Sequence, residues 1–141
     1  ADKKKQIYDE DLHIIMRQAS ASEAVQVYHL EHLQTTSGAN TLPTATVVLR
    51  RNGERFQDAA CGNGPVDAAY QAISRLTGVE VELVDYAIRS VTQGTDALGE
   101  ATVRVKRGDD EVVAKAASLD VIEASAQAFL NAINMFLLRD S

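Results

Sequence analysis

The stretch TATVVLRRNGERFQDAACGNGPVDAAYQAI (residues 44–73) recurs in altered form as EATVRVKRGDDEVVAKAASLDVIEASAQAF (residues 100–129), 56 residues further along the chain. The match extends without a gap over residues 25–73 and 81–129, and twelve of its positions are identical. A repeat of this length indicates that one folding unit occurs twice. We expect the two units to pack about a pseudo-twofold axis, and we expect function where the copies differ most.

Each copy begins with a strand and a loop. The apolar pattern predicts first strands over residues 24–35 and 79–91. In both, the apolar alternation changes phase part-way, which predicts a bulge in a long, bent strand that serves two packing surfaces. Loops of equal length are expected to follow, at 37–44 and 93–100.

A hairpin and a helix complete each copy. The dipeptide Asn52-Gly53 is the strongest hairpin signal in the chain, because a type I′ turn needs a positive φ at both positions. Gly108-Asp109 takes its place in the second copy. Apolar residues at helical spacing predict helices over 65–77 and 120–138, and Gly78 is expected to end the first of them. The predicted fold class is therefore α+β, with two β-β-β-α units that each contain a three-stranded antiparallel sheet.

The residues ahead of the repeat are expected to form a linker. Apolar residues at helical spacing predict a helix over 4–17, inside a linker that spans residues 1–23. The domain itself is assigned to 24–141, with repeats at 24–78 and 79–138. The chain opens at Ala1 in a charged, helical segment, so it looks like part of a longer protein.

Length, charge and composition exclude several classes of function. A chain of 141 residues has room for about one domain. Its net charge of −6 argues against nucleic-acid binding, because such binding usually needs a basic surface. The one basic run, at 3–5, suits the solvated start of a helix. No apolar run approaches the length of about 18–20 residues that spans a bilayer. The single cysteine and the lack of a signal-peptide pattern indicate a reducing, cytoplasmic setting.

The copies diverge most just before their helices, where residues 61–67 (CGNGPVD) correspond to 117–123 (ASLDVIE). Two glycines before a proline at the first helical position let the backbone come close to a ligand. Because the N–H groups at the start of a helix favour anions, this corner would suit a carboxylate. The alternative is an ordinary strand-to-helix turn, with Asp120 as the N-cap of the second helix.

Other residues give weaker signals. Tyr70 and Tyr86 are placed to line a site, although their spacing favours core packing. His29 and His32 lie three residues apart on a strand and so would point to opposite faces, which argues against a metal site. Cys61 has no evident base partner, and the scattered carboxylates form no acid–base constellation.

Four separate motifs together resemble a known family. They are GNGPVDAAYQAI (62–73), VELVDY (81–86), VTQGTDALGEATVRV (91–105) and DVIEASAQAFLNAIN (120–134). With LQTTSG (33–38), PTATV (43–47) and the opening ADKKKQIYDEDL (1–12), they resemble the C-terminal regulatory domain of 2-isopropylmalate synthases. The resemblance covers nearly the whole chain.

The resemblance implies a regulatory role. Enzymes of this family condense acetyl-CoA with 2-oxoisovalerate in leucine synthesis, on an upstream TIM barrel that uses a divalent metal. The domain would need no cofactor of its own. It would bind leucine as a feedback inhibitor, form a homodimer, and pass the signal through the linker to the barrel.

The resemblance also implies a leucine site near the interface of the two units. The matching positions are Gly62, Asn63, Gly64, Pro65, Val66, Asp67, Tyr86, Ser90, Asp96, Ala97, Asp120, Val121 and Ile122. Asp67 or Asp96 would face the ammonium group. The family usually has Thr where this chain has Leu119, which removes a hydroxyl contact and would narrow the pocket.

Three alternatives remain open from the sequence. The first is an isoleucine-binding domain of a citramalate synthase, since those enzymes carry a similar domain. The second is a dimerisation module that binds no ligand. The third is an independent enzyme that uses Cys61.

Overall fold

Over residues 26–140, which the computed structural model describes, the chain forms two β-β-β-α units. The first unit contains β1 (His29–Gly38), β2 (Thr41–Arg51), β3 (Glu54–Cys61) and α2 (Pro65–Thr77). The second contains β4 (Glu82–Gln93), β5 (Asp96–Arg107), β6 (Asp110–Ser118) and α3 (Val121–Asp140). Each sheet is antiparallel, in the order β1-β2-β3 and β4-β5-β6. The α+β class and the two predicted units are confirmed, whereas the linker helix at 4–17 lies outside the described residues.

The element bounds follow the sequence repeat closely. Strand β2 ends at Arg51 and β5 at Arg107, and helix α2 begins at Pro65 and α3 at Val121. Both pairs of positions differ by 56 residues, the offset of the alignment. The duplication is therefore a repeat of structure as well as of sequence, while the pseudo-twofold relation and the domain bounds stay predictions.

The predicted turn signals act as expected. Asn52 and Gly53 both have positive φ, 54° and 83°, as a type I′ turn requires. Gly108 has φ 63° in the matching turn of the second unit. Helix α2 ends at Gly78, whose left-handed φ of 71° lets its N–H donate to the Ser74 carbonyl oxygen at 2.9 Å.

Both first strands contain the predicted irregularity. The register of β1 on β2 shifts between Leu30 and His32, and that of β4 on β5 shifts between Leu83 and Asp85. A register shift of this kind is a β-bulge, which bends the strand. In β4 the shift falls where the apolar phase changes, but in β1 it lies further along than the sequence indicated.

The loops expected at 37–44 and 93–100 are wrong. Strand β1 continues to Gly38 and β2 begins at Thr41, and Gln93 pairs with Asp96 across a tight turn at Gly94, where φ is 65°. Small and polar residues there suggested a loop, but they belong to exposed strands of two long hairpins. The first strands accordingly begin and end later than predicted, at 29–38 and 82–93.

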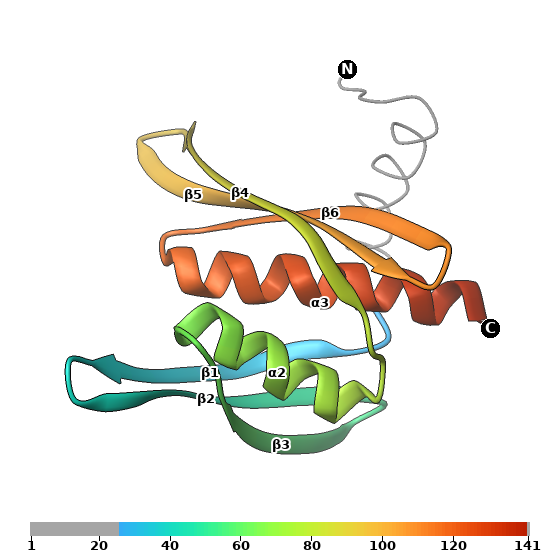
Figure 1. The fold of residues 1–141 in the computed structure, drawn as a ribbon. Coiled ribbons are helices and arrows are strands. Elements are labelled where there is room, and N and C mark those ends of the chain that lie inside the picture. The colour runs from blue at the N-terminus through green and yellow to red at the C-terminus, as the bar shows by residue number, and fades with distance from the viewer. Residues whose placement is uncertain (1–25, 141) are drawn as a thin grey trace.

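The two helices lie between the two sheets (Figure 1). Helix α2 packs on β2 and β3, and α3 packs on β5 and β6. The helices meet where the Tyr70 and Phe129 rings stack, with centroids 4.2 Å apart. Their N-terminal ends lie on the same side of the molecule, and the β1–β2 and β4–β5 hairpins extend beyond them (Figure 1).

Helix α3 is the core element. It is 20 residues long, with a mean hydropathy of 1.4 in its most apolar window, and 67% of that window is buried in the fold. By length and composition it would suit a membrane span, contrary to the expectation from the sequence. Its burial against both β5 and β6 and against α2 accounts for that composition without a membrane.

Candidate functional site

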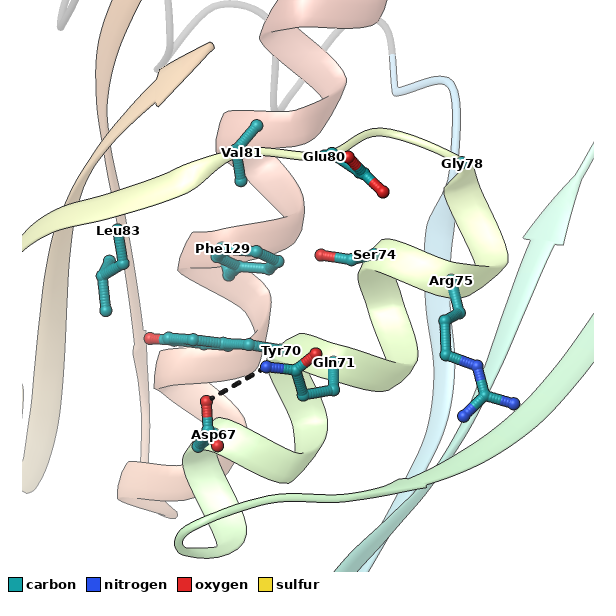
Figure 2. Close-up of a pocket in the computed structure, with 10 residues that line it drawn as sticks. All are labelled: Asp67, Tyr70, Gln71, Ser74, Arg75, Gly78, Glu80, Val81, Leu83 and Phe129. Carbon is teal, nitrogen blue, oxygen red and sulfur yellow. Dashed lines mark hydrogen bonds between the residues drawn. The ribbon is translucent and has the colours of Figure 1, made fainter.

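A groove of about 660 Å³ runs along helix α2. One wall is a single face of that helix, a second is the segment that leads into β4, and the floor includes a ring from α3 (Figure 2). The lining residues are Asp67, Tyr70, Gln71, Ser74, Arg75, Gly78, Glu80, Val81, Leu83 and Phe129.

The chemistry of the groove is mixed. Its apolar surface comes from the stacked Tyr70 and Phe129 rings together with Val81 and Leu83. Its polar rim carries two carboxylates, from Asp67 and Glu80. The Arg75 guanidinium is directed away, because it donates to the Ala59 carbonyl at 3.2 Å and to Asp58 at 3.1 Å (Figure 2). Such a groove suits a small molecule with an apolar part and a positive group.

The groove reaches the first turn of helix α2 at Asp67. The N-cap is Gly64, and no side chain of residues 26–140 caps the helix there. The first helical hydrogen bond runs from the Ala68 N–H to the Gly64 carbonyl at 2.9 Å. A Cβ at Gly64 would meet no described atom within 4 Å, so a group placed at this position has room. An uncapped helix start favours an anion.

The start of helix α3 is closed by its own side chains. The Asp120 carboxylate accepts the Ile122 N–H at 2.8 Å and the Glu123 N–H at 3.4 Å. The Ser118 hydroxyl donates to Glu123 at 2.6 Å. The proposed N-cap role of Asp120 is therefore confirmed. The two copies share a backbone design, but only the first leaves its helix start open.

Two residues shape the open corner. Asp67, at the third helical position, reaches back and accepts the Asn63 N–H at 2.8 Å, much as in a capping box. The backbone of Gly62 lies against the first turn, so that a Cβ there would be 2.5 Å from the Ala68 nitrogen. Because Asp67 also lines the groove, the corner and the groove meet at this residue.

A second group of predicted residues meets at the start of α3. The Tyr86 hydroxyl lies 2.6 Å from Ser125 Oγ, which is also 2.8 Å from the Val121 carbonyl and donates to it. Ser90 pairs across the sheet with Gly99. A Cβ at Gly99 would be 2.9 Å from Val121, so β5 and α3 touch at that point. Tyr86, Ser90 and Val121 thus share one neighbourhood.

Comparison with known proteins identifies the domain. Residues 6–137 match the family model of the LeuA allosteric (dimerisation) domain. The chain belongs to this family.

Similar proteins support the assignment. The chain is 44% identical over 138 residues to a 2-isopropylmalate synthase of Carboxydothermus hydrogenoformans. The aligned region covers 97% of the chain and 27% of that protein. It is 47% identical over 138 residues to the 2-isopropylmalate synthase of Methylacidiphilum infernorum, with the same coverage of 97% and 27%. It is 46% identical over 135 residues to that of Thermosynechococcus vestitus, with 95% and 25% covered. The LeuA domain therefore spans about a quarter of the length of these relatives.

Of the predicted leucine contacts of the LeuA domain, Asp67 alone lines the groove. Asp120 and Ile122 line a second pocket, of about 240 Å³, against β1. Asp96 and Ala97 are exposed where β5 leaves the hairpin turn. Leu119 is 76% exposed and lines neither pocket, so its expected narrowing of the site finds no support. The leucine contacts as a set stay a prediction.

The sequence did not single out several groove residues. Gln71 and Ser74 follow Asp67 at helical spacing, a polar stripe that the sequence shows but that was not connected with a site. Leu83 and Phe129 come from distant parts of the chain, and only the packing of α2 against α3 and β4 brings them there. Tyr70 is 6% exposed, which confirms its predicted core packing, and it also lines the groove. The same prediction is wrong for Tyr86, which is 37% exposed.

Metal and thiol chemistry find no support among the described residues. No group of three His, Cys, Asp or Glu side chains within 26–140 could hold a metal ion. His29 and His32 are both exposed on β1. Cys61 is an exposed free thiol at the end of β3 and lines neither pocket.

Strand β4 of the LeuA domain exposes an apolar surface. Its side chains Leu83, Val84, Tyr86 and Ile88 are 40%, 47%, 37% and 39% exposed. Contiguous exposed apolar residues of this kind mark interaction surfaces. The family description names dimerisation, and among the described strands β4 is an edge strand that pairs with β5 alone.

Proposed function

We propose that this domain binds leucine and thereby regulates a 2-isopropylmalate synthase by feedback inhibition, as a homodimer in the cytoplasm. The family match and the names of the relatives support the class of function. The observation that carries the ligand proposal is the open start of α2 beside a groove that is both apolar and acidic. A free amino acid presents matching groups: a carboxylate, an ammonium group and an apolar side chain.

The groups of leucine fit the surface in one orientation. Its carboxylate would lie at the uncapped start of α2, where N–H groups and the helix dipole favour an anion. Its ammonium group would lie toward Asp67, whose two oxygens accept from the Asn63 N–H and the Gln71 amide and can each accept a further bond. Its side chain would lie on the apolar surface, and burying it contributes about 1.5–3 kcal/mol.

Titration calorimetry against leucine, isoleucine and valine tests the ligand. We expect leucine to bind most tightly. Tighter binding of isoleucine would favour the citramalate synthase alternative, and no heat with any of the three would favour a dimerisation module. Alanine is the matched control, since it has the same charged groups without the apolar side chain.

Gly64→Asp is expected to weaken leucine binding at least about tenfold without harming the fold. Position 64 corresponds to Asp120 in the second copy, so the new carboxylate would cap α2 as Asp120 caps α3. The open space around Gly64 and its extended φ of −168° accommodate a side chain. The measurement is leucine affinity together with the melting temperature.

Gly64→Ala is the control for that variant, because it adds a Cβ but no charge and no cap. We expect it to bind leucine nearly as the wild type does. Unchanged leucine affinity in Gly64→Asp would show that the corner at 62–67 does not hold the carboxylate. In a synthase that carries this domain, the same variant should be less inhibited by leucine while its catalytic rate is kept.

Ile88→Lys is expected to shift the domain from dimer toward monomer in sedimentation experiments. Ile88 is 39% exposed, so a charged side chain there is tolerated by the monomer but would be unfavourable in an apolar interface. Leu42→Lys, at another exposed apolar position on the first hairpin, is the comparison. If Ile88→Lys remained fully dimeric, the interface would not include this part of β4.

A further inference from the structure

Tyr70 stands out among the residues that line the groove. Its hydroxyl is buried and has no hydrogen-bond partner, which holds for no other buried side-chain nitrogen or oxygen of the described residues. Buried polar groups are hydrogen-bonded as a rule, and leaving one unpaired costs about 1–3 kcal/mol. An unpaired hydroxyl at the wall of a groove therefore indicates a partner that arrives from outside.

The surroundings of Tyr70 fix where its hydroxyl points. The ring stacks on Phe129 at an interplanar angle of 14°, so it has little freedom to turn toward another acceptor. The hydroxyl points to the side of the groove where Leu83 lies, while Asp67 lies one turn earlier on α2 (Figure 2). Burial, with a smaller contribution from nearby Tyr86, raises the pKa of the Tyr70 hydroxyl. It therefore keeps its proton and is a donor.

Neighbouring hydroxyls do not meet this need. Tyr86 and Ser125 are 2.6 Å apart, and Ser125 donates in turn to the Val121 carbonyl. Tyr28, the other buried tyrosine of the first unit, has a partner, since its hydroxyl accepts from Arg51 at 3.2 Å. Tyr28 and Tyr70 are equally buried, at 6% exposure, and differ in this respect.

We infer that the Tyr70 hydroxyl donates a hydrogen bond to the carboxylate of the amino acid that binds in the groove, and so acts as a ligand-binding residue. The inference rests on the proposed function and adds a residue that was assigned to core packing. A neutral hydroxyl that donates to a carboxylate makes one of the stronger hydrogen bonds in proteins.

Access to the hydroxyl requires a small movement. Because the oxygen is closed off from solvent, the ligand reaches it when the segment around Leu83 moves outward. The bulge between Leu83 and Asp85 interrupts the pairing of β4 with β5 and gives that segment a natural point of bending. Ligand binding would in this way change the position of β4.

Tyr70→Phe tests the inference, because it removes the hydroxyl and keeps the stacked ring. We expect the ligand-free variant to melt a few degrees higher than the wild type, since a buried unpaired group is gone. We expect its leucine affinity in calorimetry to fall about tenfold. 3-Methylbutylamine, which is leucine without its carboxylate, should bind the variant and the wild type equally.

Tyr28→Phe is the matched control, with an equally buried ring outside the groove, and it should bind leucine as the wild type does. Leucine affinity of Tyr70→Phe within about twofold of the wild type would overturn the inference and leave the proposed function standing. An equal loss for leucine and 3-methylbutylamine would show that the hydroxyl does not act on the carboxylate. A wild-type chain that binds no leucine would overturn the proposed function and this inference together.

Discussion

Asn134→Leu is expected to lower the free energy of unfolding by about 2–5 kcal/mol, the largest loss we expect from a single substitution in this domain. Asn134 is 3% exposed in the middle of α3. Its side chain accepts the Tyr28 N–H at 2.9 Å and donates to the Tyr28 carbonyl at 3.0 Å. Leucine has a similar volume but satisfies neither group, so two backbone groups of a buried residue would lose their partner.

Asn131→Leu is the matched control for this prediction. Asn131 lies one turn earlier on α3 and is 7% exposed, and its amide donates to the Lys115 carbonyl at 3.0 Å. Because that contact involves one backbone group rather than two, we expect a loss about half as large. Chemical denaturation of both variants measures the difference. Equal losses in the free energy of unfolding would show that the two bonds to Tyr28 stabilise the fold no more than the one bond to Lys115.

The Asn134 contact also bears on regulation. Tyr28 immediately precedes β1, and Asn134 holds its backbone against the core helix from 106 residues away. Residues before Tyr28 would connect the domain to the rest of a synthase under the proposed function. Asn134 therefore holds the backbone next to that connection in place, and loosening it should weaken inhibition as well as stability.

The sequence predicted the parts of the fold that depend on local backbone chemistry. Asn52-Gly53, Pro65 and Gly78 each demand a particular φ, and the structure has a type I′ turn, a helix start and a helix end at those positions. The bounds of α2 agree with the prediction for the same reason. Where turn chemistry is weak, as in the stretch that contains Pro43, the prediction of a loop failed and the chain forms a strand.

The alignment of the two copies also concealed a difference in strand register. Leu30 pairs with Leu49, and the corresponding residues by sequence are Tyr86 and Val105. In the structure Tyr86 pairs with Val103 instead, and Leu83 pairs with Val105. An alignment without gaps cannot show this slip, because strand register depends on contacts between strands rather than on the order of residues. The slip places the Tyr86 hydroxyl within reach of Ser125 on α3.

Only part of the candidate site could be predicted, because the rest of it also depends on contacts between distant segments. The corner at 62–67 is local, so its glycines and proline were visible in the sequence. The groove beside it is made by α2, α3 and the start of β4 together. Leu83 and Phe129 lie 46 residues apart in the sequence, so no single short motif contains both. Tyr70 has the helical spacing of a core residue, and only its unpaired hydroxyl distinguishes it from one.

Gly62→Ala is expected to destabilise the domain by about 3 kcal/mol and to abolish leucine binding. An added Cβ would lie 2.5 Å from the Ala68 nitrogen, 2.7 Å from Asp67 Oδ2 and 2.8 Å from the Ala68 Cα. Two of these atoms are backbone at the start of α2, so the clash is relieved only by displacing the helix start. That displacement would also break the bond from Asn63 to Asp67 that shapes the corner.

Gly62 and Gly64 give a sharp comparison, because they lie two residues apart in the same corner and differ in the space around them. Alanine at 64 meets no atom within 4 Å and should leave the melting temperature almost unchanged. Alanine at 62 should lower it by roughly 6–12 °C for a domain of this size. If both variants had the melting temperature of the wild type, Gly62 would not lie against the first turn of α2. The same corner therefore separates a glycine that the fold requires from one that leaves room for a ligand.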